Sequence, residues 1–142
     1  MRGAKRLAAL GALVLGIVIP STAFASSASV VHLYFDGKQQ TSSDTGFTSS
    51  SNVSWGSSAS HGPIVGKSMI RCTYLTDSTA RCTASIVIGN SSVFFKDEII
   101  NFNNPTYVIQ GGTGDWAGAQ GVVLVHNVSD TASNVEVVLS AT

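Results

Sequence analysis

Beyond its first 25 residues the chain consists of short segments in which apolar and polar residues alternate. Alternation with a period of two places successive side chains on opposite faces of a β-strand, whereas an amphipathic helix requires a period near 3.6. In Val30–Asp36, for example, Val31, Leu33 and Phe35 fall on one face and more polar residues on the other. No part of this region shows a helical period, so the sequence predicts an all-β domain.

Turn residues divide this region into seven or eight expected strands. They are Val30–Asp36, Asn52–Trp55, Ile64–Leu75, Ala80–Ile88, Ser92–Phe102, Thr106–Gln110, Gly121–Val128 and Val135–Leu139. Many short strands joined by tight turns are typical of antiparallel barrels and sandwiches. Because closing a sheet on itself removes its exposed edges, we favour a closed barrel over a sandwich.

The alternation fades between residues 37 and 63, where serine is abundant and the only large apolar side chains are Phe47, Val53 and Trp55. A structureless loop of this length is unusual inside a compact domain. We therefore expect one poorly patterned strand near Asn52–Trp55 with mobile flanks. Two interpretations of the tract remain open: a lid over the barrel mouth, or a floppy polar insertion.

The first 25 residues have the layout of a secretory signal peptide. Three basic residues precede an apolar stretch at 7–19 that is too short to span a bilayer, and residues 23–25 read Ala-Phe-Ala, a small-x-small cleavage site. We expect a secreted protein whose mature domain is residues 26–142, with a retained membrane anchor as the alternative. No other stretch could cross a membrane, so no membrane contact is expected after the leader is removed.

Charge further limits the partners that are expected. All eight acidic residues follow Ala25, but only five of the eight basic residues do, so the exported chain would carry a net charge of −3. Neutralisation of phosphates by Lys and Arg supplies non-specific affinity for nucleic acids. We therefore exclude nucleic acid as a partner, and leave a homo-oligomer open.

The chain has two cysteines, Cys72 and Cys82. Pairing them across a hairpin would centre the turn on Asp77, and a disulfide is the expected state in an oxidising compartment. A reactive thiol or a metal ligand is the alternative. Further metal ligands at a recognisable spacing are missing, which favours the disulfide.

Residues 111–121 read GGTGDWAGAQG, and five of these eleven residues are glycine. Glycine adopts a positive φ without steric cost and marks bulges and tight bends in strands. We interpret the stretch as a sharp corner between two strands. A dinucleotide fingerprint is excluded because its third glycine comes one residue late and a β-favouring run, not a helix, follows. The expected structural motif comprises Gly111, Gly112, Thr113, Gly114, Gly118 and Gly121.

This stretch resembles the signature hairpin of the allene oxide cyclase and dirigent barrel superfamily. The resemblance rests on GGTG, on Trp116 two residues later, and on the glycines that follow. It implies an eight-stranded closed antiparallel barrel that holds an apolar or phenolic small molecule in its lumen. Tyr34-Phe35-Asp36 also resembles the end of the first dirigent strand, but Phe35 replaces the usual histidine and Gln120 replaces an arginine of the corner.

The resemblance and the strand pattern together indicate candidate catalytic residues. They are Tyr34 and Asp36 on the first strand, and Asp97 or Glu98, because one of these two acids should point inward. Desolvation in an apolar lumen would raise the pKa of a carboxyl and suit it to proton transfer. The alternatives are a turn-capping role for Asp36, and a solvated or ion-paired acid at 97 or 98.

The leading hypothesis is a secreted barrel that binds an apolar or phenolic molecule and directs its cyclisation or stereoselective coupling. No metal or organic cofactor is expected, because His32, His61 and His126 lie on separate segments without metal-ligand spacing. Orientation of a reactive intermediate would then supply the catalysis. The rival hypothesis is a non-catalytic ligand carrier, or a module that binds a partner or surface.

Overall fold

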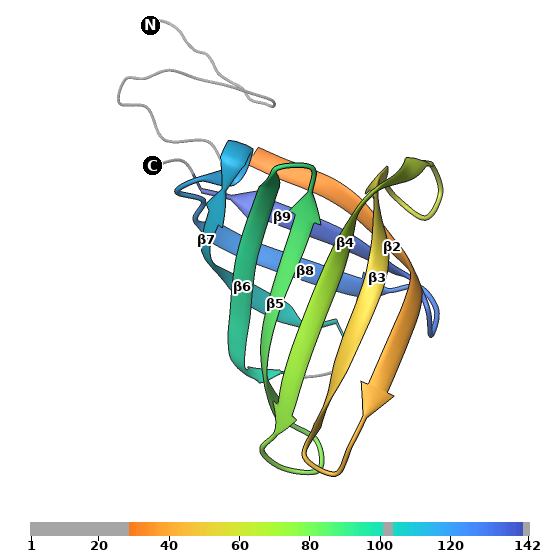
Figure 1. The fold of residues 1–142 in the computed structure, drawn as a ribbon, viewed down its shortest axis with the longest axis vertical. Coiled ribbons are helices and arrows are strands. Elements are labelled where there is room, and N and C mark those ends of the chain that lie inside the picture. Colours follow the sequence, from red (N-terminus) through yellow and green to blue (C-terminus); the bar gives the residue numbers. More distant parts are fainter. Residues whose placement is uncertain (1–28, 101–103, 141–142) are drawn as a thin grey trace, which may run out of the picture.

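A computed structural model describes residues 29–100 and 104–140 of the protein, with side chains described outside 98–100 (Figure 1). The expected signal peptide at residues 1–25 lies outside the described residues. Within the described ranges, no helix has the length and apolar character needed to cross a bilayer.

The described chain forms one closed antiparallel barrel of eight strands, in which β2 pairs with β9 to complete the ring (Figure 1). This confirms the expected barrel and excludes the sandwich. The strands are β2 (Ser29–Ser42), β3 (Gly46–Gly56), β4 (His61–Tyr74), β5 (Ala80–Ile88), β6 (Ser91–Ile100), β7 (Thr106–Thr113), β8 (Gly121–Asn127) and β9 (Ser133–Leu139).

One half of the barrel interior is packed solid with aliphatic side chains. The apolar face of each alternating strand turns inward, because burial removes that face from water. Six inward residues of this half are fully buried, namely Leu33, Val53, Ile86, Val93, Val123 and Val137. The packed half is therefore the hydrophobic core that holds the sheet closed.

The serine-rich tract is where the structure departs most from expectation. It forms the second half of β2, all of β3 and the start of β4, joined by short turns. The strand expected near Asn52–Trp55 is confirmed as part of β3, whereas the expected lid or floppy insertion with mobile flanks is wrong. The alternation was hidden because two inward positions of β3 carry Ser49 and Ser51 instead of apolar residues. The tract is a wall of the barrel.

The glycine-rich stretch forms the expected corner. β7 ends at Thr113, a 3₁₀ turn η1 (Gly114–Trp116) follows, and β8 begins at Gly121. Trp116 packs against the core, which matches a structural role for its ring. The backbone amide of Asp115 donates a hydrogen bond to Ser91 Oγ (2.9 Å), so the corner lies beside the turn between β5 and β6.

The disulfide between Cys72 and Cys82 is confirmed. The two residues are direct partners in the β4–β5 ladder, their Cα atoms lie 4.1 Å apart, and both are buried. The hairpin turn is centred on Asp77, as its spacing predicted.

We expect the double variant Cys72→Ser, Cys82→Ser to unfold with a free energy about 2 to 3 kcal/mol below that of the wild type, because a short covalent loop is opened in the unfolded chain. Urea denaturation followed by circular dichroism measures the difference. Mass spectrometry of the unreduced wild-type protein should find the peptides of residues 72 and 82 linked. Free thiols in most molecules would contradict the assignment.

Candidate functional site

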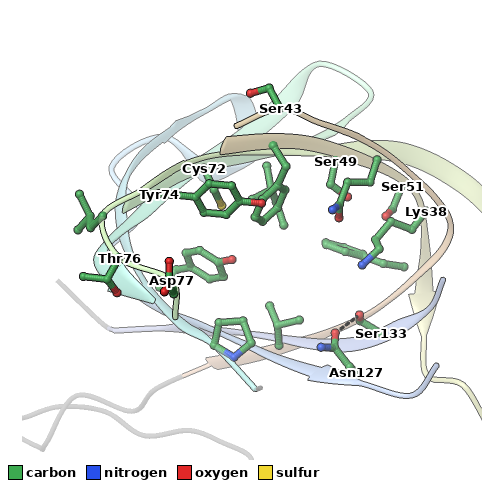
Figure 2. Close-up of a pocket in the computed structure, with 18 of the residues that line it drawn as sticks. Lys38, Ser43, Ser49, Ser51, Cys72, Tyr74, Thr76, Asp77, Asn127 and Ser133 are labelled. Carbon is green, nitrogen blue, oxygen red and sulfur yellow. Dashed lines mark hydrogen bonds between the residues drawn. The ribbon is translucent and has the colours of Figure 1, made fainter. Parts of the chain in front are cut away.

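The other half of the barrel opens into a cavity of about 850 Å³, which we call the cup (Figure 2). The loops β2–β3 and β4–β5 lie around its mouth, together with Pro105 before β7 and the strand ends at Asn127 of β8 and Ser133 of β9. A volume of this order is typical of small-molecule sites. The glycine-rich corner lies at the opposite, packed end of the barrel, beside the β5–β6 turn.

Apolar and aromatic side chains form the floor and much of the wall of the cup. Phe35, Phe47, Ile70, Tyr107 and Val125 come from five different strands and all line it. Their inward position follows from the alternation that packs the closed half. An apolar molecule that entered the cup would be removed from water by these five residues.

A polar wall faces the cavity from β2 and β3. Lys38, Ser49 and Ser51 all line the cup, and in Figure 2 they lie on the same side of it. On β9, the strand next to β2, Ser133 Oγ donates a hydrogen bond to Asn127 Oδ1 of β8 (2.8 Å). None of these five residues was predicted from the sequence; Lys38, Ser49 and Ser51 belong to the tract without visible alternation.

Further polar groups lie at the mouth. Asp44 lies in the β2–β3 turn and Asp77 in the β4–β5 loop, and both are exposed. Tyr74 lies close to Phe47, with ring centroids 6.0 Å apart, and both rings line the cup. The mouth is therefore polar and acidic where the interior is apolar.

Tyr107 and Asp97 combine a phenol and a carboxylate inside the barrel. Burial, and secondarily the negative charge of Asp97, raise the pKa of the Tyr107 phenol well above its usual range. Like an ordinary tyrosine, the phenol is protonated at neutral pH, and because it lines the cup it can act as a hydrogen-bond donor there. Asp97 is half-buried and pairs directly with the inward Cys82, so it lies on the inner face, although it does not itself line the cup.

The structure places the other candidate residues elsewhere. Tyr34 and Asp36 alternate with Leu33 and Phe35, so they lie on the outer face, and neither lines the cup. Tyr34 stacks on His61, with ring centroids 4.4 Å apart. The Oδ1 atom of Asp36 is buried without a hydrogen-bond partner.

The side chain of Glu98 lies outside the described residues. The inward position expected of one acid of the pair is taken by Asp97. Catalytic roles for Tyr34, Asp36, Asp97 and Glu98 stay predictions.

The barrel brings together two histidines that are far apart in the sequence. His32 Nδ1 and His126 Nε2 lie 3.8 and 3.9 Å from the two carboxylate oxygens of Glu136, on the outer face of β2, β9 and β8. In the described part of the chain, no group of three or more His, Cys, Asp or Glu side chains could hold a metal ion.

Three solved structures share this architecture. A pyocyanin demethylase aligns over 82% of this chain and 100% of its own, with a TM-score of 0.54 and 18% sequence identity. The pterocarpan synthase dirigent protein GePTS1 aligns over 90% of this chain and 97% of its own, with a TM-score of 0.56 and 14% identity. A second one, PsPTS1, covers 82% and 95%, with a TM-score of 0.55 and 13% identity.

These similarities concern the fold. The chain therefore has a dirigent-like barrel, as the glycine corner indicated. No protein-family model matches the sequence, and no curated protein matches it significantly.

Proposed function

We propose that the protein binds an apolar or phenolic small molecule in the cup. The observation that carries this proposal is an open cavity of about 850 Å³ at one end of a barrel whose other end is packed solid. Aromatic side chains in a concave site with a few polar groups are typical of small-molecule binding. The apolar floor would bind the body of the ligand, and the polar wall would orient it.

The similar structures support this choice of ligand class. Their names describe a demethylase of pyocyanin and two synthases of pterocarpans, so barrels of this kind act on small organic molecules. The disulfide and the expected leader support export from the cell, where such a molecule would be met.

A catalytic version of this function is favoured by Asp97 and Tyr107. The Asp97 carboxylate could accept a proton, and the Tyr107 phenol, which lines the cup, could donate one, while the cup holds a reactive intermediate in one orientation. Directed cyclisation or coupling is the reaction class we propose for it. Ligand identification after purification from the native source, followed by assay of conversion with the wild type and Asp97→Asn, separates enzyme from carrier.

Binding is tested by filling the cup. Ser51→Phe places a ring in the cavity, and we expect it to weaken binding of the neutral fluorescent probe N-phenyl-1-naphthylamine by about tenfold or more, a loss of about 1.4 kcal/mol. Fluorescence titration gives the dissociation constants. Circular dichroism verifies that the variant remains folded.

Ser50→Phe is the matched control, because Ser50 directly precedes Ser51 in β3 and lies on the outer face of the barrel. It should bind the probe as the wild type does. Absence of probe binding to the wild type, or equal binding by the Ser51 variant, would reject the cup as the ligand site.

A further inference from the structure

Strand β2 contains a bulge at the level of the cup. Its pairing with β3 runs from Leu33 opposite Trp55 to Asp36 opposite Asn52, and then resumes one residue out of step with Gln39 opposite Ser50. Gly37 lies within the bulge with φ 62°, a left-handed conformation that favours glycine. The glycine at position 37 therefore allows the bulge to form between Asp36 and Gln39.

The bulge changes which side chains of β2 face inward. Phe35 faces the interior, so an unbroken alternation would turn residues 37, 39 and 41 inward and leave Lys38 on the outer surface. Instead, Lys38 and Gln40 line the cup. Bulges at the rims of barrels commonly redirect a side chain in this way. The consequence is a lysine on the wall of an apolar cavity.

The surroundings of Lys38 suit an anionic ligand. Its side chain points into the cup in Figure 2, on the side that carries Ser49 and Ser51. Among the described residues, no carboxylate forms an ion pair with its ammonium group. The ammonium group of Lys38 and the hydroxyl groups of Ser49 and Ser51 are therefore hydrogen-bond donors on the same side of the cup, available to an anionic oxygen there.

The two aspartates of the cup lie farther out. Asp44 follows Lys38 by six residues and lies in the turn beyond the end of β2, and Asp77 lies in the loop between β4 and β5. Both are exposed, and solvent and salt screen exposed charges strongly. Lys38 is exposed as well, so solvent screens its charge in the same way. Its advantage is position, because it lies on the wall beside Ser49 and Ser51, whereas both aspartates lie in loops at the mouth.

We infer that Lys38 is a specificity-determining residue that selects ligands with an apolar body and a terminal anionic oxygen, a carboxylate or a phenolate. This inference rests on the proposed function of the cup and narrows its ligand class. The anionic oxygen lies at Lys38 with Ser49 and Ser51, and the apolar body lies on Phe35, Tyr107 and Val125. Displacement of water by the body strengthens the attraction, because the local dielectric falls.

A matched pair of probes tests the inference. The anion 2-naphthoate and the neutral 2-naphthamide have nearly the same shape, and isothermal titration calorimetry gives both affinities. The wild type should bind naphthoate about tenfold more tightly than naphthamide. Lys38→Met should abolish this preference, weakening naphthoate by about tenfold while leaving naphthamide within about twofold.

Lys67→Met is the control, since Lys67 is exposed on β4 and does not line the cup. It removes the same charge and should leave both affinities unchanged. If the wild type binds neither probe, the cup is not a site for such molecules and the proposed function fails.

If the wild type binds both probes equally, or Lys38→Met weakens both to the same extent, the inference is overturned while the cup remains a ligand site. Lys38→Arg, which retains the charge, should keep the preference for naphthoate. Loss of the preference in that variant would likewise overturn a charge-based role.

Discussion

Replacing Gly121 by alanine is expected to prevent stable folding, with a loss of about 4 kcal/mol or more in the free energy of unfolding. Gly121 is the first residue of β8 and pairs with Leu139 of β9. Its φ of 137° is one that residues with a Cβ atom rarely adopt, and a methyl group there would overlap the carbonyl oxygen of Val138. The substitution therefore strains the backbone and pushes apart two strands of the barrel.

Gly62→Ala is the matched control for this prediction. Gly62 lies in β4 without a positive φ, and no atom lies within 4 Å of the position its Cβ would take. Circular dichroism and urea denaturation of both variants measure the contrast. Equal stability of the two variants would show that β8 and β9 can separate locally at little cost.

The regular parts of the barrel were predictable from sequence because their inward positions are apolar. β5 begins and ends at the residues expected from its alternation, and the hairpin it forms with β4 was located from the two cysteines. The corner at residues 111–121 was predictable for a different reason. Gly111, Gly114, Gly118 and Gly121 all have a positive φ, which glycine adopts at the lowest cost, so the run of glycines indicates the bend directly.

The site was not predictable in the same way, because it lies where the pattern is broken. Ser49 and Ser51 occupy inward positions of β3, so the strand carries polar residues on both faces and loses its periodicity. The bulge at Gly37 then shifts the phase of β2 by one residue, which turns the exposed Lys38 toward the cup. A phase shift of this kind depends on pairing with the neighbouring strand, which a single strand does not reveal.

Which face of the first strand points into the barrel was also not predictable from the sequence. A barrel can present either face of a strand to its interior, and resemblance to dirigent barrels favoured Tyr34 and Asp36. In this chain, the closed half is packed, so the apolar face with Leu33 and Phe35 turns inward and the polar face turns outward. Asp97 faces inward because its neighbour Phe95 does so two residues earlier.

Phe95→Ala should be the most damaging truncation of a core side chain, lowering the free energy of unfolding by about 3 to 5 kcal/mol. Phe95 is 2% exposed and is the largest fully buried side chain among the described residues. Its ring meets that of Tyr107 edge to face, with centroids 5.1 Å apart. Removing it leaves a cavity directly behind a residue that forms the floor of the cup.

The adjacent Phe94 provides a control that differs only in the face of the strand on which it lies. It is 45% exposed on the outer surface of β6, so Phe94→Ala should cost less than about 1 kcal/mol. Urea denaturation of both variants gives the two values. Because Tyr107 loses its supporting ring only in Phe95→Ala, probe binding in the cup should weaken in that variant alone. Comparable losses in stability for the two variants would mean that the interior of the barrel is not the packed core that closes one end and supports the floor of the site.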